Sequence, residues 1–263
     1  MQAFWGLFKK DMILLRFWSI AWLICVCLAM VVGFIAADKM GDQSLVVPMY
    51  VFAMSIQVLF MPIMLIYVLN LEGKTQMWLY NPQSSWKLIF SKLASVGCFQ
   101  LISQLLLLGY GFILLKQLMS SDMVTTSANL LPINLIASFH LGIFAVSVYF
   151  GVLMLFYWTI YHALAKYPRI QPFRWLVLVG IWIVWNTLET LIARVLGNTP
   201  IFSFGLQVNP VPNMHYDKVG KNWSIVQSQE AHNFPITVFI LYLLVAIIIF
   251  VVSSRLLDKK VEV

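Results

Sequence analysis

The stretch that decides how this chain is read is residues 70–92, NLEGKTQMWLYNPQSSWKLIFSK, the most polar interruption between two long apolar runs. It mixes apolar and aromatic side chains with charged ones, a composition typical of a segment at a membrane surface. Asn81-Pro82 is typical of a helix start, with Asn as the N-cap and Pro at the first helical position. We therefore expect a short helix over about residues 71–80, a turn, and a second helix that runs from Pro82 into the bilayer.

A short helix hung between two membrane spans could act as a mechanical coupling element. A soluble partner that pushed such a helix would pass the displacement to both spans. The alternative is a plain connector with no mechanical role.

The composition predicts that the chain is an integral membrane protein. Of its 263 residues, 61% are hydrophobic and 10% are charged, whereas soluble domains carry about 25% charged residues. A membrane helix needs about 20 mainly apolar residues, and backbone hydrogen bonds must close within each span, which excludes open strands. We expect one all-α transmembrane domain over residues 1–263, with six spans at about 17–37, 47–69, 93–115, 136–163, 175–196 and 236–256.

The residues before the first span form a candidate interfacial helix over positions 1–16. Phe4, Phe8, Met12 and Leu15 recur at helical spacing, with charged residues between them. The alternative is a simple basic flank. The apolar run after Arg16 is too long for a secretory signal core. The three cysteines lie inside apolar runs, where we expect buried thiols rather than disulfides or metal ligands.

The orientation follows from Lys and Arg in the short flanks, which favour the cytoplasmic side. With the N-terminus inside, twelve of the seventeen basic residues are cytoplasmic. Six spans then place both termini and residues 70–92 in the cytoplasm of a multi-pass cell-membrane protein. The twelve are Lys9, Lys10, Arg16, Lys74, Lys87, Lys92, Lys166, Arg169, Arg174, Arg255, Lys259 and Lys260.

The external connections are unequal in length. Residues 197–235 form a connection far longer than usual, and its aromatic residues argue against a disordered linker. We expect a compact external cap there, against the alternative of a floppy loop.

Catalytic and nucleotide-binding patterns are absent from the sequence. Gly73-Lys74-Thr75 resembles the end of a phosphate-binding loop, but the glycine required five positions earlier is Val68. The histidines have no metal-ligand spacing, and no basic run with stacking aromatics indicates nucleic-acid binding. The chain is therefore predicted not to be an enzyme, to hold no cofactor or metal, and to need a second protein for any ATP-driven work.

Polar residues inside the spans are candidates for a translocation path, because ionisable groups in hydrocarbon usually face protein or a wet cavity. The alternative for each is a hydrogen bond that joins helices, or for the charged pair a place near the external headgroups. The candidates are Gln100, Gln104, His140, Asn186, Glu189 and Arg194.

The whole pattern resembles the membrane-spanning subunit of type-2 ABC exporters. The likeness rests on six spans, the basic amphipathic N-terminus FKKDMILLR at 8–16, and the connection that runs from Glu72 through Asn81-Pro82 to Lys92. In that family an acidic residue ends the second span and a Lys begins the third. The family's basic residue after the Ser of this connection is missing here, and Lys87 is the nearest substitute.

The resemblance implies a second, identical or similar permease subunit and a cytosolic ABC ATP-binding subunit that binds ATP and Mg²⁺. Residues 71–80 would be the coupling helix, with Glu72 and Lys74 as polar contacts to the ATPase, and residues 1–16 the connecting helix. The coupling residues on this reading are Leu71, Glu72, Gly73, Lys74, Met77, Trp78 and Tyr80.

The abundant Met and aromatic residues would suit an amphipathic or hydrophobic cargo such as a peptide, lipid or drug. Two other functions stay open at this point. One is an ATP-independent transporter or channel, although the sequence has no clear internal repeats of the kind typical of that class. The other is a non-transporting membrane protein, such as an immunity or sensor component.

Overall fold

The computed structural model describes residues 2–40, 46–75, 83–120, 133–196, 206–208, 211–217, 222–228, 232–234 and 236–260. Six long α-helices account for most of them, and each has a stretch long and apolar enough to cross a membrane. For the described residues, this confirms the prediction of six helices of membrane-spanning length and composition. They are α1 (Gln2–Met40), α2 (Val46–Thr75), α3 (Ser85–Ser120), α4 (Ile133–Ala163), α5 (Arg174–Leu196) and α6 (Ile236–Lys260).

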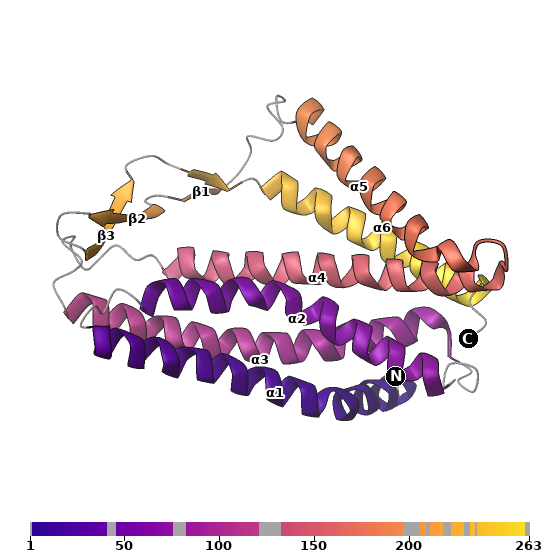
Figure 1. The fold of residues 1–263 in the computed structure, drawn as a ribbon, viewed down its shortest axis with the longest axis horizontal. Coiled ribbons are helices and arrows are strands. Elements are labelled where there is room, and N and C mark those ends of the chain that lie inside the picture. The colour runs from indigo at the N-terminus through magenta and orange to yellow at the C-terminus, as the bar shows by residue number, and fades with distance from the viewer. Residues whose placement is uncertain are drawn as a thin grey trace.

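Helix α2 occupies the centre of the bundle. It packs against α1, α3 and α4, while α6 lies against the opposite side of α4. Helix α5 diverges from the bundle and touches it mainly through α4. Figure 1 also shows both chain termini at the same end of the bundle, and the strands near the other end. Two short 3₁₀ turns, Leu164–Lys166 and Gln171–Phe173, connect α4 to α5.

The boundaries at the N-terminal end differ from the prediction. Residues 1–16 were expected as an interfacial helix separate from the first span, but α1 is continuous from Gln2 to Met40. At 1.5 Å per residue, 39 residues extend about 58 Å, roughly twice the 30 Å hydrocarbon core. The predicted interfacial helix and the first span are therefore parts of one continuous helix.

The predicted coupling helix, residues 71–80, is not a separate helix in the part of it that the structure describes. Residues 71–75 are not a separate helix but the last residues of α2, which ends at Thr75. Helix α3 begins at Ser85 rather than at Pro82. Residues 76–82, which include Met77, Trp78, Tyr80, Asn81 and Pro82, lie outside the described residues.

The start of α3 is capped from a distant part of the chain. The carbonyl of Ser84 accepts the first helical hydrogen bonds, from Lys87 and Leu88. The backbone N–H of Ser85 donates to Oδ1 of Asp258 at 3.2 Å. A carboxylate suits this position because the first N–H groups of a helix lack internal partners and carry partial positive charge. The C-terminal end of α6 is thereby joined to the α2–α3 connection.

Replacing Asp258 with alanine is expected to lower the free energy of unfolding by about 1 kcal/mol, the usual loss on removing an N-cap acceptor. Asp258→Asn keeps an oxygen acceptor and should cost less. Thermal unfolding of the purified protein in detergent measures both variants. Equal losses for the two substitutions would contradict a capping role.

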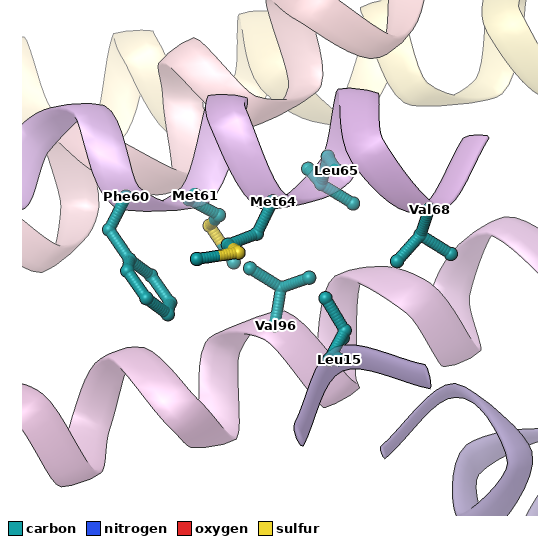
Figure 2. Close-up of a cluster of buried hydrophobic side chains, with 7 residues drawn as sticks. All are labelled: Leu15, Phe60, Met61, Met64, Leu65, Val68 and Val96. Atoms are coloured by element: carbon teal, nitrogen blue, oxygen red, sulfur yellow. The ribbon is translucent and has the colours of Figure 1, made fainter. Parts of the chain in front are cut away.

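The central core forms where three helices meet. Figure 2 shows the side chains of α2 directed toward Val96 of α3 and Leu15 of α1. All seven members are at most 3% exposed, and they interdigitate because side chains three and four apart share a helix face. The α2 members are Phe60, Met61, Met64, Leu65 and Val68.

Two of the cysteines contradict the expectation of buried thiols. Cys25 and Cys27 are exposed on α1, and Cys98 is intermediate. A thiol on the lipid-facing side of a membrane helix stays in an apolar environment without being covered by protein. The prediction of buried thiols is therefore wrong for Cys25 and Cys27.

The long connection between α5 and α6 contains β-structure, so the all-α description holds for the membrane helices and not for this segment. Strands β1 (Leu206–Val208) and β4 (His232–Phe234) pair antiparallel. Strands β2 (Val211–Asp217) and β3 (Asn222–Ser228) form a second antiparallel pair in which Tyr216 lies opposite Trp223. The nesting of one pair within the other along the chain suits the predicted compact cap.

Candidate functional site

A buried charge cluster joins the three N-terminal helices at the end of the bundle where α2 ends and α3 begins. At its centre is Lys92 of α3, whose ammonium lies 2.7 Å from Oε2 of Glu72 on α2 and 3.3 Å from Oδ1 of Asp11 on α1. All three side chains are at most 3% exposed. One cation therefore connects carboxylates from two other helices.

Two further residues complete the cluster. Lys10 pairs with the other carboxylate oxygen of Glu72 and lies 3.9 Å from Asp11. Ser91 donates a 2.6 Å hydrogen bond to Oδ2 of Asp11. With two lysines and two carboxylates, the four charges balance.

This balance explains how such a cluster survives away from water. Desolvating an isolated ion costs several kcal/mol, and only close partners with additional hydrogen bonds offset that cost. Both oxygens of Asp11 and both oxygens of Glu72 are engaged. Because the Lys10–Glu72, Lys92–Asp11 and Lys92–Glu72 pairs each bridge two helices, relative sliding of α1, α2 and α3 would separate charges. The cluster thus makes these three helix segments a mechanical unit.

The position of Glu72 corrects one prediction. Glu72 was expected to be a polar contact on the surface of a coupling helix, but it is 2% exposed and faces inward. Its charge is engaged by Lys10 and Lys92 within the chain. Any influence of Glu72 on a cytosolic partner would therefore act by holding the end of α2 in place. Lys74, two residues later, is exposed, and Leu71 and Gly73 are partly exposed.

Asp11 was missed at the sequence level, although a signal for it existed. It interrupts the apolar face of an amphipathic segment, and a carboxylate on that face needs a buried partner. The identity of that partner required the tertiary structure, because Asp11 and Lys92 are 81 positions apart.

A second polar cluster lies deeper in the bundle, between α2, α3 and α4. The amide of Gln57 donates to Oγ of Ser103 at 2.6 Å. Gln100 donates to the carbonyl of Gln57 at 3.3 Å and accepts from Ser147 at 2.9 Å. The predicted residue Gln100 thus lies in a buried inter-helix network, as the helix-joining alternative expects.

The predicted residues Gln104 and His140 lie next to this network. Gln104 donates to the carbonyl of His140 at 3.4 Å, and Nε2 of His140 is 3.3 Å from the hydroxyl of Tyr50. Among the described residues, Gln57 Oε1 and His140 Nδ1 are buried with no hydrogen-bond partner. These two atoms could therefore form further hydrogen bonds inside the bundle.

The three predicted residues of α5 are not brought together. Asn186 is exposed and donates to the carbonyl of Trp182 in its own helix at 2.7 Å. Arg194 is exposed near the helix end. Glu189 instead turns toward α4, where Oε1 accepts from the hydroxyl of Tyr149 at 2.7 Å and from the indole of Trp185 at 2.8 Å. The remaining predicted coupling residues Met77, Trp78 and Tyr80 lie outside the described residues.

The chain is similar in sequence to a bacterial protein over the full length of both. A protein of Bacillus subtilis (strain 168), the "Uncharacterized protein YhcE", is 29% identical over 275 residues, an alignment that covers all of both chains. No protein-family model matches the chain. The chain is thus similar, along its whole length, to a bacterial protein whose name carries no activity.

Proposed function

We propose that this chain is the membrane-spanning permease subunit of an ATP-driven ABC exporter, and that it works with a separate cytosolic ATP-binding subunit and a second permease subunit. The observation that carries the proposal is the charge cluster of Asp11, Glu72 and Lys92 beside the α2–α3 connection. Its cargo on this proposal is amphipathic or hydrophobic, and passes along a path formed by the membrane helices.

The cluster supports the proposal because its ion pairs would transmit a force from the α2–α3 connection to three helices. A partner seated on the α2–α3 connection would push on the end of α2 and the start of α3. Glu72 and Lys92 belong to those two ends, and Asp11 adds α1 to the same unit. A displacement at the connection would therefore move three helices together. Work is transmitted in this way only if ATP binding favours one of two arrangements of the helices over the other.

The resemblance to type-2 ABC exporters adds a second line of support. In that family an acidic residue ends the second span and a Lys begins the third, and here the corresponding residues form an ion pair of 2.7 Å. The exposed side chains of Lys74 and Lys87 flank this pair. They offer polar contacts to a cytosolic partner in place of the buried Glu72.

The proposal is tested by site-specific crosslinking in the membranes of the cell that makes this protein. A photoreactive amino acid at Lys74 or Lys87 is expected to crosslink to a protein that carries a complete phosphate-binding loop. The same group at Lys39, at the other end of α1, should not. Purified with that partner in liposomes, the chain should support cargo movement that requires ATP.

Two results would reject this function. One is crosslinking of Lys39, but not Lys74 or Lys87, to cytosolic proteins, which would reverse the orientation. The other is cargo movement by the purified chain alone, which would favour an ATP-independent transporter.

A further inference from the structure

A largely open apolar cavity of about 510 Å³ lies between α4, α5 and α6, and its lining residues Gly180 and Val184 are exposed. Five of its lining residues belong to α5, and α4 and α6 each contribute one. Drug-sized ligands bind in cavities of this size that are mostly apolar and carry a few polar groups at defined positions. The lining residues are Phe156, Val177, Gly180, Ile181, Val184, Trp185 and Ile249.

A carboxylate is hydrogen-bonded to one of the residues that line the cavity. Trp185 lines the cavity, and its indole N–H lies 2.8 Å from Oε1 of Glu189. Glu189 is one turn further along α5 and shares the face of Trp185. Ile181 lies at the middle of the candidate membrane span Gln171–Ile192. Glu189 is eight residues beyond it, about 12 Å along the helix axis, which corresponds to the outer part of a 30 Å hydrocarbon layer.

Within the part of the chain that the structure describes, this carboxylate has hydrogen bonds but no ion-pair partner. Tyr149 and Trp185 donate to Oε1, and none of the ion pairs found in the described part of the chain includes Glu189. A charge in hydrocarbon is costly and usually marks a functional site. Two neutral donors lower that cost without neutralising the charge, so the site still attracts a cation.

Aromatic rings surround the same place. Tyr149 packs edge-on against Tyr242 of α6 with ring centroids 5.1 Å apart, and Trp185 hydrogen-bonds the Tyr149 hydroxyl at 3.1 Å. Aromatic faces attract organic cations, most strongly when water is excluded. A carboxylate beside several rings, hydrogen-bonded to a residue that lines an apolar cavity, fits one class of ligand on both charge and shape.

We propose that the α4–α5–α6 cavity binds a lipophilic organic cation, with the charged centre against Glu189 and the apolar body beside Gly180 and Phe156. If the chain is the proposed exporter, this cation would be its class of cargo. Only that step from ligand to cargo rests on the proposed function. Binding itself requires neither ATP nor the second subunit.

The test measures binding to the purified chain in lipid nanodiscs with no ATPase present. The probes are tetraphenylphosphonium, a lipophilic cation, and triphenylphosphine oxide, a neutral molecule with similar rings. Glu189→Gln keeps an acceptor for Tyr149 and Trp185 but removes the charge. It is expected to weaken tetraphenylphosphonium binding about thirtyfold or more, as when one partner of a desolvated charge pair is removed. Binding of triphenylphosphine oxide should stay unchanged.

A second variant tests the cavity without touching the charge. A Cβ added at Gly180 meets no atom within 4 Å, so Gly180→Phe should fit into the cavity and block both probes. Gly109→Phe is the matched control, since a Cβ there is equally unobstructed and Gly109 does not line the cavity. It should leave both affinities unchanged.

The proposal is overturned if wild-type protein shows no saturable tetraphenylphosphonium binding, or if Glu189→Gln weakens both probes equally. It is also overturned if Gly180→Phe and Gly109→Phe behave alike, as they would if the cavity held only lipid tails. Because these results are obtained without nucleotide, they are independent of the crosslinking that tests the proposed function.

Discussion

Replacing Lys92 with methionine is expected to lower the free energy of unfolding by about 3–5 kcal/mol, the loss found when one partner of a buried ion pair is removed. The substitution removes the buried ammonium that pairs with both Asp11 and Glu72 and leaves the partly exposed Lys10 beside the two carboxylates. Unfolding of the purified protein in detergent, followed by intrinsic fluorescence, measures the loss. Lys87→Met is the matched control, since Lys87 lies on the same helix but is exposed, and should change stability by less than about 0.5 kcal/mol.

A double variant separates lost charge balance from lost packing. Lys92→Met combined with Glu72→Met removes one charge of each sign and leaves Lys10 beside Asp11. Balanced removal of a buried ion pair is often neutral or stabilising, so the double variant should be more stable than Lys92→Met alone. If Lys92→Met were as mild as Lys87→Met, the three-helix cluster would not hold the bundle together.

Replacing Gly151 with leucine is expected to destabilise the bundle by about 1–3 kcal/mol through overpacking. Gly151 of α4 is buried against α2, and a Cβ at this position would lie 2.9 Å from Cδ1 of Leu65 and 3.1 Å from Cγ of Met61. Small residues at helix contacts let membrane helices approach closely. The larger side chain would force α2 and α4 apart along their contact.

Gly109→Leu provides the comparison for this effect. Gly109 also lies within a membrane helix, but a Cβ there meets nothing within 4 Å, so leucine should be tolerated. Both variants are assayed by thermal unfolding in the same detergent. Similar melting temperatures for the two would contradict a tight α2–α4 contact at Gly151.

The sequence alone predicted the number of membrane helices, because about 20 consecutive apolar residues have few other uses. It did not predict where helices begin and end at the polar connections. Leu71, Glu72 and Gly73 were assigned to a separate helix but belong to α2. The first turn of α3 depends on Asp258, 173 positions away, and no local pattern reveals such a cap.

For the candidate sites too, the sequence identified unusual residues but not their partners. The sequence marked Gln100, Gln104, His140 and Glu189 as unusual because polar groups in hydrocarbon need partners. It could not say that Gln100 and Gln104 hydrogen-bond to the backbone of α2 and α4. Nor could it say that His140 lies beside Tyr50 or that Glu189 bonds to Tyr149. It also missed Asp11, since a carboxylate near a charged N-terminal flank looks solvent-exposed until the helix is packed.

By itself, the sequence determined that this protein spans a membrane with six helices and that its polar residues are concentrated at a few positions. Hydropathy decides both, because it depends on each residue and its near neighbours. Only the tertiary structure decided that Asp11, Glu72 and Lys92 form one buried cluster and that a cavity lies beside Trp185. Charge pairing and cavity shape depend on residues that are distant in the chain, and the packing of the helices brings those residues together.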